Sequence, residues 1–316
     1  MSGKKRKISD IGTPLTVAHL GKSGSFSEQA AAQYFADEKR PVTLASYKSF
    51  VQVFDAVENG DCKYGVVPIE NSDSGSFRKV YDLLTQHKLF IVGEYVSAEE
   101  HCLCALPGVS VENITEVWSH PKALEMCERY LNKLEQTNKT AINRTVVGDT
   151  TEGCEKLAAS ESKTAACIAS AKAAASNNLN VLEKPISNDK QIMTRYVVLS
   201  REQSNIAAQA TQLKSTLLLA VKNQKGALFK LLSCFAFRDI NVLQVEVRPS
   251  SKALEMFDHS KHWEYIHFID YEPSGDAKTD SNLLTSLEEY CISVRSFGTY
   301  RKHIYNGNDE YTLMYH

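Results

Sequence analysis

The chain has 316 residues, of which 43% are hydrophobic and 23% are charged, as in ordinary globular proteins. This length favours about two or three folding units rather than one small domain. The formal net charge of −2 gives no electrostatic basis for binding nucleic acid or a membrane surface. No apolar stretch approaches the ~20 residues that a membrane-spanning helix needs. We therefore expect the protein to bind neither nucleic acid nor a membrane.

The eight cysteines are scattered through apolar or helical patterns, and Cys102 and Cys104 are too close together for the usual zinc-finger spacing. We therefore expect reduced thiols, no metal site and a cytoplasmic location. Residues 1–14 carry Lys4-Lys5-Arg6-Lys7 but lack the apolar segment of a secretory signal. We expect a disordered basic tail there, with a nuclear address or a weak transit segment as alternatives.

The first part of the chain alternates predicted strands and helices. One helix is expected to start at Ser27 as its N-cap, and another has Phe50, Val53, Phe54 and Val57 at helical spacing. The alternation predicts an α/β layer with mostly parallel strands. The expected strands are 16–21, 42–47, 64–69, 90–96 and 101–106, and the expected helices are 27–36 and 49–59.

The segment Val66-Val67-Pro68-Ile69-Glu70-Asn71-Ser72-Asp73-Ser74-Gly75 runs from a buried strand into a cluster of polar side chains. A helical pattern follows. Polar groups at the carboxyl end of a buried strand are where open α/β sheets place ligand chemistry, and a helix start offers free N–H groups to an anion. The same residue types are also ordinary capping residues, so a capped turn is the alternative interpretation.

A second α/β unit begins near Leu106-Pro107-Gly108, where a turn marks a crossing of the chain. We expect lobe 1 to comprise about residues 15–105 and 182–203, lobe 2 about residues 106–181, and a ligand cleft to lie between them. The elements expected in lobe 2 are strands 114–119, 145–147 and 165–168 and helices 121–134, 151–159 and 169–175; the segments expected to return to lobe 1 are 182–185 and 194–200.

Residues 204–213 have the polar, alanine-rich composition of a linker, and the pattern then changes to the order βαββαβ. This order predicts a ferredoxin-like module over residues 214–303, with a C-terminal tail at 304–316. By fold analogy we assign it a regulatory role. Its expected strands are 216–221, 240–247, 262–271 and 292–295, and its expected helices are 227–237 and 282–290.

Several motifs, in this order, closely resemble the prephenate dehydratase family from about Thr16 to Tyr300. They are the Gly24-Ser25-Phe26-Ser27 turn, the Glu70–Gly75 segment, Ser119-His120-Pro121 and Thr194-Arg195-Tyr196. The C-terminal part resembles the ACT module of that family, through Gly226-Ala227-Leu228, Ile240-Asn241-Val242 and Glu246-Val247-Arg248-Pro249.

The resemblance implies a two-lobed, periplasmic-binding-protein-like catalytic domain followed by a ferredoxin-like ACT domain. It implies a lyase that converts prephenate to phenylpyruvate, carbon dioxide and water without a cofactor. In some members the substrate is arogenate and the product phenylalanine. It further implies feedback regulation by L-phenylalanine through the ACT domain, and a homodimer or homotetramer.

The resemblance also implies roles for individual residues. Thr194 matches the family's proton donor, with Glu70 as its expected support, while Arg195 either pairs with a substrate carboxylate or points into the structure. The expected substrate-binding residues are Asn71, Ser74, Ser25, Ser119, Arg195 and Lys122. The expected L-phenylalanine site comprises Gly226, Ala227, Leu228, Asn241, Glu246 and Arg248.

The chain departs from the family pattern at three positions. Lys122 and Met126 stand where glutamines are usual, and Met126 cannot replace an amide hydrogen bond. Val247 replaces the serine of the ACT motif. His120 is a candidate acid or a helix cap. Two other function classes stay open: a non-enzymatic binding protein that has lost catalysis, and an acyl-transfer enzyme using Ser119 or Cys127, for which no base and orienting carboxylate are evident.

Overall fold

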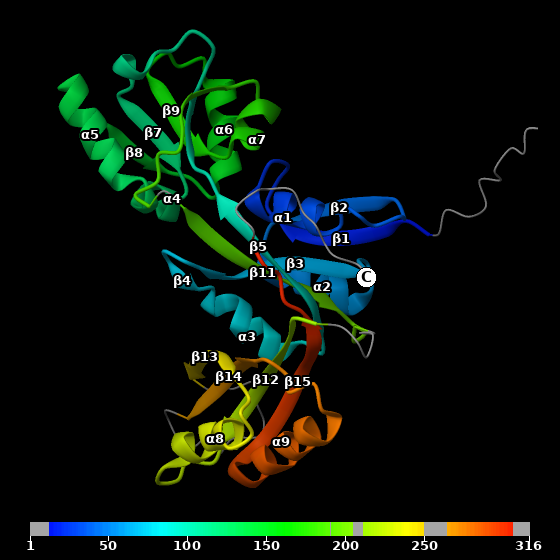
Figure 1. Ribbon diagram of the computed structural model, residues 1–316. Helices are drawn as coiled ribbons and strands as arrows, with labels where there is room; N and C mark the ends of the chain where they lie inside the picture. The colour runs from blue at the N-terminus through cyan, green and yellow to red at the C-terminus, as the bar shows by residue number, and fades with distance from the viewer. Residues whose placement is uncertain (1–12, 190, 205–210, 250–263, 306–316) are drawn as a thin grey trace, which may run out of the picture.

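The computed structural model describes residues 13–189, 191–204, 211–249 and 264–305 (Figure 1). The basic segment Lys4-Lys5-Arg6-Lys7, most of the expected linker and most of the expected C-terminal tail lie outside the described residues, as do positions 262 and 263 of an expected strand. No helix in the described ranges is long and apolar enough to cross a membrane.

Lobe 1 is built on a sheet with the strand order β2-β1-β3-β11-β5. The first three strands along the chain pair in parallel, whereas β11 is antiparallel to both of its neighbours. Its elements are β1 (Leu15–Leu20), α1 (Phe26–Tyr34), β2 (Val42–Tyr47), α2 (Phe50–Asn59), β3 (Tyr64–Asn71), β4 (Gly75–Ser76), α3 (Arg78–Gln86), β5 (Phe90–Glu99) and β11 (Ile192–Ser200).

Lobe 2 is built on a second sheet with the order β10-β6-β9-β7-β8. The chain passes between the lobes after β5 and again before β11 (Figure 1). The elements of lobe 2 are β6 (Cys102–Ala105), a 3₁₀ helix (Val111–Asn113), β7 (Glu116–Ser119), α4 (Pro121–Met126), α5 (Glu128–Asn138), β8 (Asn143–Val146), α6 (Thr150–Ser160), β9 (Ala165–Ala169), α7 (Ala171–Ser176) and β10 (Asn180–Glu183).

Three local expectations are corrected by the structure. Both β6 and β10 belong to lobe 2, because β6 pairs with β9 and with β10, so the lobe boundaries lie at different positions than expected. The N-cap of α1 is Ser25 rather than Ser27, since the Ser25 hydroxyl accepts the Glu28 N–H. The expected helix 121–134 is two helices, which meet at Cys127, where φ is −112° and ψ is 12°.

The C-terminal domain has the expected βαββαβ order, and its antiparallel sheet has the strand order β13-β14-β12-β15. Its two helices cover one sheet face through buried residues such as Leu231, Leu283 and Leu287. Its elements are β12 (Leu213–Val221), α8 (Ala227–Ala236), β13 (Val242–Pro249), β14 (Tyr265–Tyr271), α9 (Ala277–Tyr290) and β15 (Cys291–Arg301).

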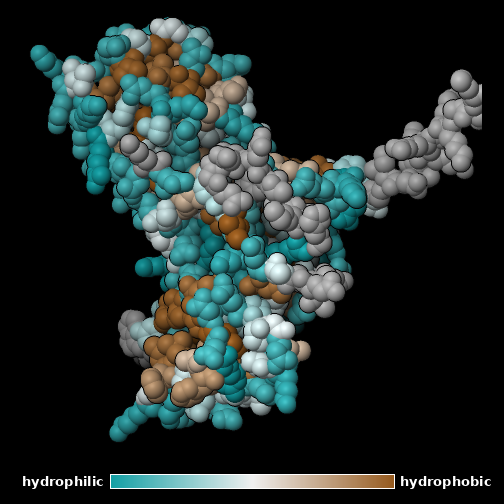
Figure 2. All heavy atoms as spheres, viewed as in Figure 1, coloured by the Kyte–Doolittle hydropathy of each residue, from teal (hydrophilic) through white to brown (hydrophobic). Residues whose placement is uncertain are grey.

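The other face of this sheet packs on lobe 1, and the two share one hydrophobic core. Phe268 and Phe297 of the C-terminal domain lie in the same buried cluster as Tyr81 and Leu84 of α3. Figure 2 shows hydrophobic residues gathered on the surface over β13 and β14. The β13 side chains Val245 and Val247 are exposed.

Candidate active site

The structure joins Asn71 and Thr194, which sit opposite each other on β3 and β11. Both are buried. The Asn71 Oδ1 accepts the N–H groups of Asp73 and Ser74, each at 3.0 Å, which turns the amide nitrogen toward Thr194. Asn71 Nδ2 then donates to Thr194 Oγ1 at 2.8 Å. Since a hydroxyl has one donor and two acceptor sites, the Thr194 O–H keeps its own proton for another acceptor.

The turn after β3 is therefore both a capped turn and a wall of the candidate site. Ser74 is exposed beside this pair, with its Oγ 3.4 Å from Asn71 Oδ1. Ser72 ties the turn to β11, because its hydroxyl accepts the Met193 N–H at 3.0 Å. The two interpretations of this segment do not exclude each other.

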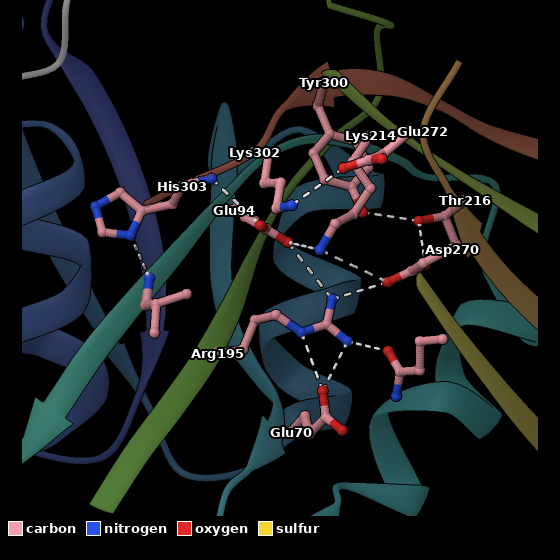
Figure 3. A network of polar contacts seen from close by, with 12 residues as sticks. Glu70, Glu94, Arg195, Lys214, Thr216, Asp270, Glu272, Tyr300, Lys302 and His303 are labelled. Carbon is pink, nitrogen blue, oxygen red and sulfur yellow. Dashed lines mark hydrogen bonds and ion pairs between the residues drawn. The ribbon is translucent and has the colours of Figure 1, made fainter. Parts of the chain in front are cut away.

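Arg195 and Glu70 lie on the opposite face of the sheet from Thr194 and Asn71, because side chains alternate along a strand. Arg195 Nη2 and Glu70 Oε2 are 3.1 Å apart. Arg195 Nη1 and Asp270 Oδ2 of the C-terminal domain are 2.9 Å apart, and Gln244 of that domain also accepts from Arg195 (Figure 3). This geometry corrects the expectations that Arg195 binds substrate and that Glu70 supports Thr194.

Arg195 is the centre of a charged network between lobe 1 and the C-terminal domain (Figure 3). Only 12% of its side chain is exposed. Burial lowers the pKa of Arg195, but the carboxylates of Asp270 and Glu94 outweigh it and raise that pKa. Lys214 Nζ lies 2.6 Å from Glu94 Oε2, and Thr216 donates to Asp270 at 2.7 Å, so each carboxylate has more than one partner.

The two serines expected to hold anionic groups use their hydroxyls inside the protein. Ser25 caps α1 and donates to the Leu20 carbonyl at 3.1 Å. Ser119 is fully buried and donates to the Ile168 carbonyl at 2.7 Å. In this arrangement neither O–H proton is free to donate to an anionic group of a substrate, which corrects those two expectations.

The expected cleft between the lobes is bridged at the Gly24 turn. Ser170 of lobe 2 donates to the Gly24 carbonyl at 3.0 Å, and Lys172 of lobe 2 pairs with Glu28 of α1 at 3.4 Å. Gly24 has φ +89°, and a Cβ there would lie 2.7 Å from the Ala173 Cα, so only glycine permits this approach of the lobes.

The start of α4 does not present the expected cation. The exposed Lys122 Nζ pairs with Glu125 of the same helix at 2.9 Å, which corrects its expected place at the substrate. His120 is the helix cap, since its Nδ1 accepts the Lys122 N–H at 3.2 Å, and burial lowers its pKa. Met126 is buried.

Two of the expected effector residues instead contact lobe 1. Glu246 accepts the Ser76 hydroxyl at 2.7 Å, and Arg248 pairs with Asp82 of α3 at 3.1 Å. Asn241 donates to Glu272 at 3.0 Å within the domain. The other three, Gly226, Ala227 and Leu228, form the start of α8, where Gly226 has φ +72°.

Sequence reasoning missed Glu99, which lies near Thr194 at the end of β5. The Tyr196 hydroxyl donates to Glu99 Oε1 at 2.9 Å. The sequence carried no usable signal, because the strand predicted there ends at residue 96, whereas β5 runs on to Glu99 and so places this side chain on the face of Ser97. Among the described residues, no group of three or more His, Cys, Asp or Glu side chains is placed to hold a metal ion.

The family model and the curated relatives point to one family. The family model for prephenate dehydratase matches residues 17–204. Arogenate dehydratase 3 of Arabidopsis thaliana is 36% identical over 311 residues, which are 95% of this chain and 71% of that protein. The bifunctional chorismate mutase/prephenate dehydratase of Escherichia coli K12 is 32% identical over 289 residues, 90% of this chain and 70% of that protein.

A solved structure shows the same fold. The prephenate dehydratase of Arthrobacter aurescens in complex with L-Phe superposes with a TM-score of 0.78 at 24% identity. The match covers 91% of this chain and 90% of that one, so it extends over both lobes and the C-terminal domain.

Proposed function

Because the chain belongs to the prephenate dehydratase family, we propose that it converts prephenate to phenylpyruvate, carbon dioxide and water. The observation that carries this proposal is the buried Asn71–Thr194 pair, which leaves one hydroxyl proton to donate. Hydroxide is a poor leaving group, so the reaction needs a proton at the ring hydroxyl as the C–O bond breaks.

The mechanism follows from what this pair can do. Thr194 donates its hydroxyl proton to the departing oxygen, which leaves as water. The electron pair of the breaking bond to the ring carboxylate enters the ring, carbon dioxide departs, and aromatisation drives the step. Asn71 holds the Thr194 oxygen in place.

We expect prephenate to be preferred over arogenate, whose side chain carries an ammonium group instead of a ketone. The carboxylates Glu70, Glu94 and Asp270 are engaged with Arg195 or Lys214 on the far face of the sheet, and burial raises the pKa of Glu99 on the near face, which favours its uncharged form. An ammonium group left without an anionic partner costs at least ~1.4 kcal/mol, or about tenfold in kcat/KM.

Purified protein is incubated at neutral pH with each substrate, and the products are phenylpyruvate, read by its absorbance in alkali, and phenylalanine, read by chromatography. A higher kcat/KM for arogenate than for prephenate would show that arogenate is the preferred substrate. Binding of prephenate by calorimetry without turnover of either substrate would instead establish a non-enzymatic binding protein.

We further propose that the C-terminal domain is an ACT domain that binds L-phenylalanine as a feedback inhibitor. Its βαββαβ order and the L-Phe complex of the Arthrobacter protein support this. Through Glu246 and Arg248, β13 contacts the β4 strand and α3, so movement of β13 reaches the turn that holds Asn71. The exposed Val245 and Val247 support pairing of two copies through this domain.

Titration with L-phenylalanine is expected to lower the initial rate in a saturable manner and to release heat in calorimetry. D-Phenylalanine is the matched control, because it has the same hydrophobicity with the wrong handedness. A flat rate with no heat of binding rules out this role of the domain.

Competing assignments have less support. Burial raises the pKa of the Cys127 thiol to about 12, and the Ser119 hydroxyl is bound to a carbonyl, so neither is an activated nucleophile. The eight free cysteines support a reducing compartment, for which we propose the cytoplasm.

A further inference from the structure

Glu99 shares a sheet face with Thr194, in the middle of the candidate active site. On the paired strands β11 and β5, Glu99 is opposite Ile192 and Ser97 is opposite Thr194. Residues directly opposite each other project to the same face, as do alternate residues along one strand. Thr194 and Glu99 are therefore diagonal neighbours, which lie within reach of a long side chain.

Tyr196 anchors the Glu99 carboxyl on this face. Its hydroxyl donates to Glu99 Oε1 at 2.9 Å. Tyr196 is fully buried, and burial together with the Glu99 charge raises its pKa well above the usual value, so Tyr196 stays a donor. With Oε1 occupied, the second carboxyl oxygen is the one left for Thr194.

The surroundings of Glu99 favour its protonated form. Burial raises its pKa, and hydrogen bonds from Thr194 and Tyr196 offset part of that rise. Of the other titratable groups nearby, burial lowers the pKa of His101 to about 4, so this ring is neutral at pH 7. Glu100 is engaged by the exposed Lys184 at 3.0 Å, and Tyr95 is buried on the same strand as Glu99.

We propose that Glu99 holds the proton that Thr194 passes to the leaving hydroxyl of the substrate, so that Asn71, Thr194 and Glu99 act as one directed relay. This inference rests on the proposed dehydratase function. Glu99 is a positioning residue in this scheme, because it acts through Thr194.

The relay has a defined direction and a balanced outcome. Asn71 Nδ2 donates to the Thr194 oxygen. Thr194 donates to Glu99 while that group is ionised; once Glu99 is protonated the bond reverses, both acceptor sites of the Thr194 oxygen are filled, and its O–H is free to point at the substrate. As the C–O bond breaks, the Thr194 proton goes to the departing oxygen and forms water, while Thr194 takes the proton of Glu99. The new carboxylate is stabilised by Tyr196 and regains a proton from solvent after carbon dioxide leaves.

The test compares the wild type with Glu99→Gln and Glu99→Asp in pH profiles of kcat. Because the relay needs the acid form, wild-type kcat should fall as pH rises through the raised pKa of Glu99. Glutamine keeps the shape and a donor but cannot release a proton, so kcat should fall by about 100-fold, within the range for general acids, with KM nearly unchanged and the alkaline fall lost. Aspartate should restore part of kcat and the alkaline fall.

Tyr196→Phe provides a second readout. Loss of its hydrogen bond removes support for the carboxylate, so the alkaline fall should move to higher pH. Wild-type kcat in Glu99→Gln overturns the relay. So does a reduced kcat whose alkaline fall is unchanged, because that pattern indicates only a structural role.

A measurement independent of turnover separates this inference from the proposed function. The carboxyl carbon resonance of Glu99, assigned by its loss in Glu99→Gln, should titrate above the usual glutamate pKa of about 4.3, and its titration midpoint should shift in Thr194→Val, because that variant removes the hydrogen-bond partner of the carboxyl group. That result in a protein without turnover means that only the dehydratase function has failed. If Glu99 instead titrates with an ordinary glutamate pKa that is the same in the wild type and in Thr194→Val, the relay has failed even if the enzyme is active.

Discussion

Replacing Thr194 with alanine should lower kcat for prephenate by at least about 100-fold while the protein stays folded, because the step loses its proton donor. The change also leaves the buried Asn71 Nδ2 without its acceptor at 2.8 Å, which costs about 1–3 kcal/mol of folding stability. KM should change little, since the hydroxyl contributes mainly in the transition state. Phenylpyruvate absorbance measures kcat, and circular dichroism on heating measures the fold.

Two matched variants separate the hydroxyl from the shape of the side chain. Thr194→Ser keeps the O–H and should retain most of the turnover. Thr194→Val keeps the branched shape on β11 and should be as inactive as the alanine variant. A wild-type rate in Thr194→Ala, or an active valine variant, would remove Thr194 from the chemistry and leave the Asn71 pair with a structural role.

The fold was predictable because its signals are local. Alternating strand and helix patterns give both lobes, and the change to βαββαβ gives the C-terminal domain. Strand pairing is not local, and for this reason β6 and β10 were expected in the wrong lobe. In the structure β6 pairs with β9 of lobe 2, and β10 pairs with β6. The break between α4 and α5 at Cys127 was not predicted, because no glycine or proline lies there to indicate the end of a helix.

The candidate site was only half predictable, for a related reason. Thr194 and Asn71 could be inferred because they lie at strand ends and match family motifs. The period of a strand also states that Arg195 faces away from Thr194. That periodicity does not predict which residues pack on the other face, where Arg195 contacts Asp270 and Gln244, which are distant in sequence. Serine and histidine at helix starts are ambiguous, because capping and ligand binding use the same atoms.

The position of Arg195 also changes how regulation would reach the chemistry. Thr194 and Arg195 are adjacent on β11, one facing the candidate site and the other bound to the C-terminal domain. Any shift of Asp270 therefore acts on the strand that carries the proposed proton donor. The network is a physical link between the C-terminal domain and the candidate active site.

Arg195→Met should accordingly destabilise the protein by about 3–5 kcal/mol, because it removes the guanidinium that pairs with the buried carboxylates of Asp270 and Glu94. Arg248→Met is the matched control at the same interface: its partner Asp82 is one-third exposed, so its loss should cost no more than about 1 kcal/mol. Urea and thermal unfolding measure both changes, and a double-mutant cycle with Asp270→Asn isolates the pair.

The kinetic constants of Arg195→Met distinguish the two places that this side chain was expected to occupy. A guanidinium that clamps a substrate carboxylate contributes to binding, so its removal would raise KM strongly with stability preserved. An interdomain guanidinium gives the reverse: a lower unfolding midpoint, restored in part by Asp270→Asn because that change removes the unpaired charge, and a KM close to that of the wild type. A stable Arg195→Met variant with a KM raised tenfold or more would instead show that Arg195 binds the substrate.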